Sequence, residues 1–125
     1  MRCGAYCSCC CLLLTSIGCA QPTSQWLEQT KADDPAKRLQ AVHVLQEKRS
    51  EAATVVPALI ESLKDTNTYV RRDAARALGL FGPDAHGAIT PLIERLRDQE
   101  PSVRKAAGQS LRQIDPSAAA KAGVR

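Results

Sequence analysis

The sequence predicts an all-α solenoid, an α-α superhelix of about two and a half to three helical hairpins. Two observations predict it: the sequence repeats itself every 33 residues, and apolar residues recur at helical spacing inside each repeat. The composition agrees, because alanine and leucine are common and aromatic residues make up only 3% of the chain. The length of 125 residues suits a single domain.

The repeat is visible when residues 67–98 are written above residues 100–125. The segments LIESLKD (59–65) and LIERLRD (92–98) align in the same register. Agreement at this many positions is not expected by chance, so each repeat is predicted to be one structural unit. The shift of 33 aligns Val70 with Val103, Arg71 with Arg104, Ala74 with Ala107, Leu78 with Leu111 and Pro83 with Pro116.

Each unit contains two predicted helices with one apolar face each. Gly82 and Pro83 separate the two helices of the middle unit, because glycine can end a helix at a left-handed position and proline suits the next helix start. Pro57 and Pro91 fall in the first turn of the second helices or kink them. The apolar faces of the middle unit comprise Val70, Ala74, Ala77, Leu78 and Phe81, then Ile89, Leu92, Ile93 and Leu96.

The two ends of the array are incomplete units. Residues 24–31 align with a second helix, so the domain is expected to open with a half unit whose Trp26 and Leu27 cover the first hairpin. The last unit lacks the PLIERL stripe and ends in a short alanine-rich helix capped by Asp115. We therefore expect an uncovered apolar edge, open to a partner chain or to self-association, formed by Val103, Leu111 and Ile114.

Residues 65–79 (DTNTYVRRDAARALG) and 98–111 (DQEPSVRKAAGQSL) carry a family resemblance. They resemble HEAT repeats, most closely the short bacterial HEAT-like type first noticed in phycobilisome lyases. The resemblance covers about residues 33–125 and implies a right-handed HEAT-like solenoid. It leaves the function open, because such folds serve as scaffolds with many uses.

Asp65 and Arg71 are six residues apart, as are Asp98 and Arg104. An aspartate that ends one helix can accept hydrogen bonds from an arginine in the first turn of the next unit. Repeated along the stack, such pairs form the ladder known for HEAT-type proteins. The alternative is that Arg71 and Arg104 bind an anionic ligand.

The positive charge is concentrated in the second half of the chain, where residues 66–125 contain ten Lys or Arg and six Asp or Glu. One predicted binding face is a basic stripe that fits an acidic protein patch, lipid head groups or nucleic acid, or else is a solvated helix surface. It comprises Arg72, Arg76, Lys105 and Arg112. A second is a concave face of the second helices, with Glu61, Lys64, Glu94, Arg95 and Arg97.

No catalytic, cofactor or metal site is predicted, and the protein is expected not to be an enzyme. The two histidines, His43 and His86, occupy unmatched repeat positions and belong to no recognisable catalytic motif. The sequence contains no glycine-rich phosphate loop and no paired metal-ligand motif.

The first eighteen residues are predicted to be a signal peptide. Arg2 is the only charge before Glu28, and residues 4–17 form an uncharged stretch too short to span a bilayer. Residues 16–19 (SIGC) resemble the bacterial lipobox, which implies cleavage before Cys19 and a lipid on its thiol. Residues 19–24 then form a tether to a domain at 25–125.

Five of the six cysteines lie between residues 7 and 19, which leaves other interpretations open. The segment can be an uncleaved anchor, or its thiolates can bind a soft metal. A disulfide framework instead places cysteines throughout a fold.

The preferred function is a non-catalytic protein-interaction scaffold, a lipoprotein held at the periplasmic side of the bacterial envelope. The alternatives are a phycobilisome-lyase-like chromophore lyase or chaperone, which the family resemblance implies and which acts in the cytoplasm, and a HEAT-like nucleic-acid-binding module. Few aromatic residues are available for base stacking, so nucleic acid is the less favoured partner.

Overall fold

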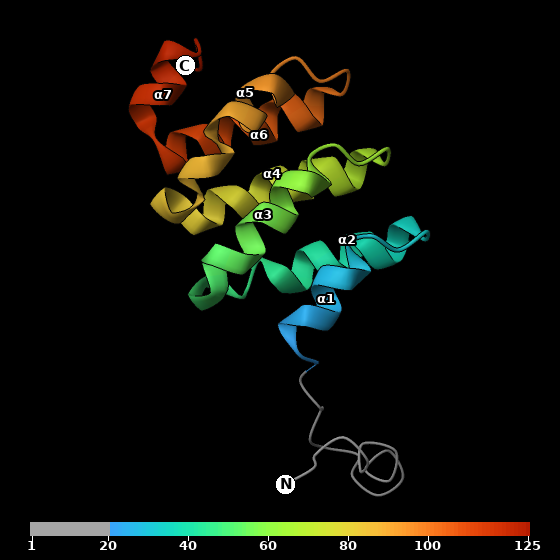
Figure 1. Ribbon diagram of the computed structural model, residues 1–125. Coiled ribbons are helices and arrows are strands. Elements are labelled where there is room, and N and C mark those ends of the chain that lie inside the picture. The colour runs from blue at the N-terminus through green and yellow to red at the C-terminus, as the bar shows by residue number, and fades with distance from the viewer. Residues whose placement is uncertain (1–20) are drawn as a thin grey trace, which may run out of the picture.

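The computed structural model describes residues 21–125, and this part of the chain contains α-helices and 3₁₀ segments but no strand (Figure 1). The predicted all-α solenoid is confirmed. The predicted signal peptide and Cys19 lie outside the described residues. The elements are α1 (Thr23–Gln29), α2 (Pro35–Leu45), η2 (Arg49–Glu51), α3 (Ala52–Ser62), α4 (Thr68–Phe81), η3 (Gly82–Ala88), α5 (Ile89–Arg95), α6 (Pro101–Ile114) and α7 (Pro116–Lys121).

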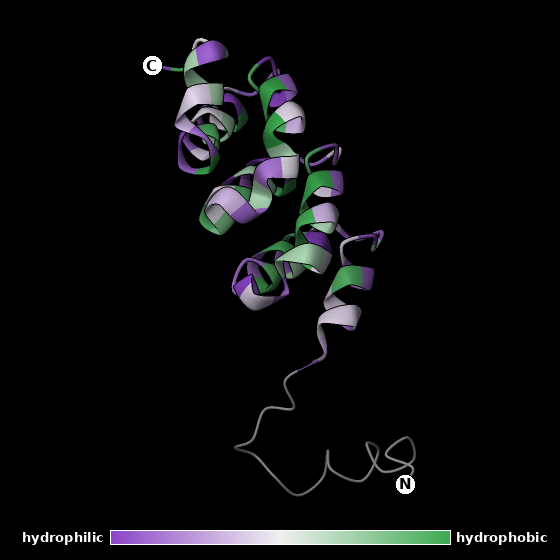
Figure 2. Cartoon of the chain, turned by 60° about the vertical axis from the view of Figure 1, so that its left-hand side comes forward, coloured by the Kyte–Doolittle hydropathy of each residue, from purple (hydrophilic) through white to green (hydrophobic). Residues whose placement is uncertain are grey.

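The helices form two layers. Helices α2, α4 and α6 lie side by side in one layer, and α1, α3 and α5 form the other (Figures 1 and 2). The most extensive contact joins α4 to α6, and α1, α3 and α5 each pack against the helix that follows. Within residues 21–125, no helix is both long and apolar enough to cross a membrane.

The core between the layers follows the 33-residue repeat. Leu45, Leu78 and Leu111 occupy the same repeat position and are all fully buried. Ala41, Ala74 and Ala107, at a second shared position, are also fully buried. Each buried leucine stabilises the fold by roughly 1.5–3 kcal/mol, and the alanines let neighbouring helices approach closely.

Local sequence explains where the helices begin and end. Asp34 and Asn67 cap α2 and α4 by accepting hydrogen bonds from main-chain amides, for instance Asn67 Oδ1 from Tyr69 N at 2.9 Å. Gly82 ends α4 with φ of 56° and ψ of −136°, a conformation that only glycine adopts readily. Pro91 lies in the first turn of α5, whereas Pro57 lies inside α3.

The N-terminal half unit begins before the expected domain boundary at residue 25. α1 begins at Thr23, so the last two residues of the predicted tether are helical. Pro22 sets this start because its extended conformation precedes the first turn. Trp26 and Leu27 are partly buried and pack against the core, as predicted.

The expected uncovered edge at the C-terminus is wrong. α6 turns its apolar face towards α4 and α5, and α7 folds back onto α6, with Ala119 and Val124 packed against the core. The amide of Val124 donates to the carbonyl of Ala119 at 3.0 Å, and Gly123 has a φ of 78°, so a Schellman-type turn closes α7. The three residues of the expected edge, Val103, Leu111 and Ile114, are buried at 0%, 0% and 5% exposure.

Candidate functional site

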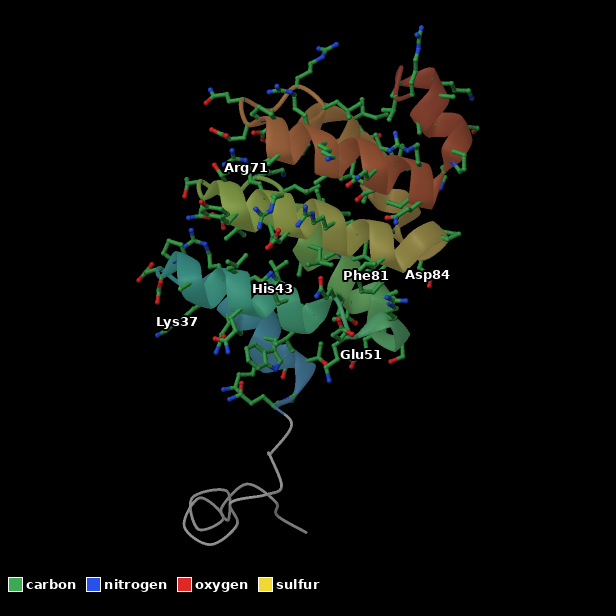
Figure 3. All side chains as sticks on the ribbon, turned by 180° about the vertical axis from the view of Figure 1, so that it is seen from behind. Lys37, His43, Glu51, Arg71, Phe81 and Asp84 are labelled. Atoms are coloured by element: carbon green, nitrogen blue, oxygen red, sulfur yellow. The ribbon has the colours of Figure 1, made fainter. Side chains whose placement is uncertain are left out.

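A ladder of arginines and aspartates links the repeats at one end of the α2–α4–α6 layer, where Figure 3 shows Arg71. Arg38 Nε and Nη2 donate to the Asp65 carboxylate at 2.7 and 2.9 Å. Arg71 donates to Asp98 in the same way at 2.9 and 3.1 Å. Both are bidentate charge-assisted pairs between residues 27 positions apart.

This pairing differs from the expected one. Arg71 reaches the main-chain oxygen of Asp65 through Nη1 at 2.9 Å, not its carboxylate, and Arg104 reaches the main-chain oxygen of Asp98 at 2.8 Å. The Asp65 carboxylate already accepts from Arg38 and from the amide of Asn67 at 2.8 Å. The predicted Asp65–Arg71 and Asp98–Arg104 carboxylate pairs are therefore wrong, although all four residues lie in the ladder.

The ladder also determines the ionisation of its aspartates. Burial raises the pKa of Asp98, but the hydrogen bonds from Arg71 and the Glu100 amide outweigh burial and hold the pKa below its ordinary value. The pKa of Asp65 is lowered in the same way, with Arg38 and the Asn67 amide opposing burial. Both carboxylates are thus ionised at neutral pH.

A second polar cluster joins α2 to α4, near His43 in Figure 3. His43 Nε2 lies 2.8 Å from Asp73 Oδ2, and Arg72 Nε donates to Asp73 Oδ1 at 2.7 Å. Arg72 also lies over the Tyr69 ring, 5.2 Å from its centroid. Burial raises the pKa of Asp73, but the bonds from Arg72 and His43 outweigh it and lower the pKa.

This second cluster links α2 to α4 through the contact between His43 and Asp73. Asp73 is buried and interacts with both basic side chains, so its charge is compensated in place. Ser110, the buried serine on α6, donates its hydroxyl to the carbonyl of Ala75 at 2.6 Å. Within residues 21–125, no three His, Cys, Asp or Glu side chains are grouped to hold a metal ion.

A groove of about 580 Å³ runs across the α2–α4–α6 layer. Its lining combines two arginines, three glutamines, a buried serine and the exposed Leu80, and it includes no carboxylate. The side chains therefore offer hydrogen-bond donors, acceptors and positive charge around an apolar contact. The lining residues are Gln46, Arg76, Leu80, Gln109, Ser110, Arg112 and Gln113.

Two further depressions continue the groove. One, of about 340 Å³, lies between α2 and α4 at His43, Gln46, Asp73 and Arg76. The other, which we name the C-terminal pocket, measures about 450 Å³ and shares Gln109 and Arg112 with the groove. Its lining comprises Leu96, Arg104, Lys105, Gly108, Gln109, Arg112, Ala122, Gly123, Val124 and Arg125.

The repeats described above match a known protein family. Residues 23–112 match the family of HEAT repeats. The chain belongs to the HEAT-repeat family. A comparison with curated proteins gives no match.

Two solved structures have the same HEAT-type fold over most of this chain. A chain from the complex of CpcE and CpcF of phycocyanin lyase from Nostoc sp. PCC7120 is 30% identical with a TM-score of 0.74, covering 89% of this chain and 44% of that one. This chain thus spans less than half of that relative's length. An engineered protein is 21% identical with a TM-score of 0.63, covering 81% of this chain and 51% of that one.

The predicted binding residues do not lie together, and most of them line different depressions of the HEAT array. Arg76 and Arg112 meet in the groove, and Lys105 joins Arg112 at the C-terminal pocket. Arg72 lines neither, because its guanidinium is bound to Asp73. Four of the five second-helix residues line a separate depression of about 360 Å³, and Glu61 does not. In this depression Asp65, Glu94 and Asp98 balance much of the charge of Lys64, Arg71, Arg95 and Arg97.

The glutamines and Leu80 of the groove were not singled out from the sequence. For Leu80, Gln109 and Gln113 the signal was the repeat itself, because Arg76 and Gln109 share one repeat position, and Leu80 and Gln113 share another. These positions face outward in successive HEAT units, so comparing their polar character along the array would have located the groove.

Proposed function

We propose that this protein is a non-catalytic HEAT-repeat scaffold that binds a partner polypeptide along the groove of the α2–α4–α6 layer. The observation that carries the proposal is the groove lining, where glutamine amides and two arginines surround the 41% exposed Leu80 without a carboxylate. Amides can pair with the main chain of a bound segment, and the arginines favour an acidic one. The similarity to a chain from the CpcE–CpcF complex supports a role in protein assembly.

The test is recovery of a partner from native cells after chemical crosslinking, using tagged full-length protein. We expect Arg76→Glu/Leu80→Glu to abolish recovery, because both exposed side chains line the groove. Arg97→Glu is the matched control, since Arg97 is exposed and lies outside the groove. The identified partner, once purified, should rebind the wild type and the control. Equal recovery by all three proteins contradicts the proposal.

The scaffold is further proposed to be a lipoprotein of the bacterial envelope, anchored by a lipid on Cys19. Support comes from the lipobox-like SIGC segment and from the uncharged stretch at residues 4–17, which follows Arg2. Labelling cells with a radioactive fatty acid tests this, with Cys19→Ser as the comparison. Label should enter the wild type alone, and incorporation that survives the substitution contradicts the anchor.

The phycocyanin lyase relative favours one second candidate, a lyase-like role. Incubating the purified protein with phycocyanin apoprotein and its chromophore separates the two functions. The scaffold account predicts no covalent attachment of chromophore by this protein alone, whereas attachment above the protein-free control establishes the lyase-like role.

A further inference from the structure

Three arginines at one repeat position make the same main-chain contacts. Arg38, Arg71 and Arg104 each point Nη1 at two carbonyl oxygens that lie six and five residues earlier. The distances are 2.8 and 2.9 Å for Arg38, 2.9 and 3.1 Å for Arg71, and 2.8 and 3.0 Å for Arg104. The three guanidinium groups are therefore held in the same way.

Two of the three arginines also bind a carboxylate through their remaining guanidinium nitrogens. Nε and Nη2 of Arg38 and Arg71 hold Asp65 and Asp98. Among residues 21–125, no carboxylate pairs with Arg104. The side chain of Asp115 is not available to Arg104, because it caps α7 by accepting from two amides.

The surroundings of Arg104 reinforce this open position. Arg104 is exposed and lines the C-terminal pocket together with Lys105, Arg112 and Arg125, and no acidic side chain lines it. Val124 and Leu96 provide the apolar part of the lining. The pocket thus combines an oriented guanidinium with three further basic side chains, of which Arg112 donates to the main-chain oxygen of Arg125 at 2.8 Å. Such an excess of basic side chains attracts anionic groups.

We propose that Arg104 is the docking residue for an aspartate or glutamate side chain of the partner polypeptide. The inference rests on the proposed scaffold function and adds the partner's chemistry. Carboxylate is the ligand because the two equivalent arginines of this chain bind carboxylates with the same Nε and Nη2 atoms. The partner would complete the third step of the Arg–Asp ladder.

The test measures binding of a fluorescein-labelled oligo-aspartate peptide to the full-length protein by fluorescence anisotropy. Arg104→Ala should weaken binding about tenfold. Arg104→Lys should weaken it nearly as much, because lysine keeps the charge and loses the two-pronged geometry. Arg49→Ala is the matched control, an exposed arginine at the other end of the array, and should change binding less than about twofold.

Wild-type affinity in Arg104→Lys overturns the docking geometry and leaves only diffuse charge attraction. Tighter binding of an oligothymidylate of equal charge, with the same dependence on Arg104, overturns the choice of a protein carboxylate. Circular dichroism of each variant verifies folding. Partner recovery through the groove that persists in Arg104→Ala would leave the scaffold function intact while removing this inference.

Discussion

Asp98 illustrates how one side chain can join two repeats. Its carboxylate accepts two hydrogen bonds from Arg71 and one from the Glu100 amide, and Arg95 lies 3.5 Å away. The side chain is only 4% exposed, so solvent cannot replace these partners. The charge of Asp98 is thus essential to the local packing of α4 against the loop before α6.

Replacing the charged Asp98 side chain should destabilise the folded protein. We expect Asp98→Asn to lower the free energy of unfolding by about 2–4 kcal/mol, because Arg71 then keeps its buried charge without a carboxylate. Glu61→Gln, which breaks an exposed 3.5 Å pair with Lys64, should cost less than about 0.5 kcal/mol. Urea unfolding measures both, and equal losses would contradict the structural role of the ladder.

The lowered pKa values of Asp65 and Asp98 predict acid sensitivity. In the window between the lowered folded pKa and the ordinary value of about 3.9, the unfolded chain binds more protons, so stability falls as pH falls. The urea midpoint should stay nearly constant from pH 7 to about 5 and drop below about pH 4. Asp65→Asn/Asp98→Asn should show a smaller drop, and an unchanged drop would exclude these two carboxylates as its source.

At the scale of elements, the α4–α6 contact depends on the absence of a side chain at Gly79. A methyl group there would lie 2.6 Å from Ser110 Oγ and 3.0 Å from Ser110 Cα. These distances are shorter than van der Waals contact, so the two helices would have to separate.

Gly79→Ala should therefore destabilise the protein by about 1–3 kcal/mol. Gly87→Ala is the control, because a methyl group at Gly87 in η3 would meet no atom within 4 Å. That change should be neutral or slightly stabilising. Thermal unfolding reports both variants, and a neutral Gly79→Ala would show that the contact adjusts without loss.

The helices themselves were predictable from sequence, because apolar spacing and the 33-residue repeat both reflect burial. Leu45, Leu78 and Leu111 show this, since repeat alignment placed them together and all are fully buried. The carboxylate pairing was not predictable, because it depends on whether Arg71 meets the side chain or the main chain of Asp65. Burial of Ile114 was missed because α7 covers α6 with alanine and Val124 instead of a leucine stripe.

At the scale of the whole molecule, acidic and basic side chains are distributed unevenly over the surface. The depression beside the ladder mixes acidic and basic side chains, whereas the groove and the C-terminal pocket have basic side chains and no acidic side chain in their linings. The groove and the C-terminal pocket therefore carry more basic than acidic side chains. A partner that binds there meets positive charge from α4 and α6 together.

Site-specific photocrosslinking in native cells tests the central claim that this surface binds a partner polypeptide. A photoreactive side chain replaces Gln109, which lines both the groove and the C-terminal pocket, or Thr54, an exposed residue of α3 outside both. A discrete protein adduct from position 109, with none from position 54, is the predicted result. The claim is contradicted when position 109 gives no protein adduct or when both positions give the same one.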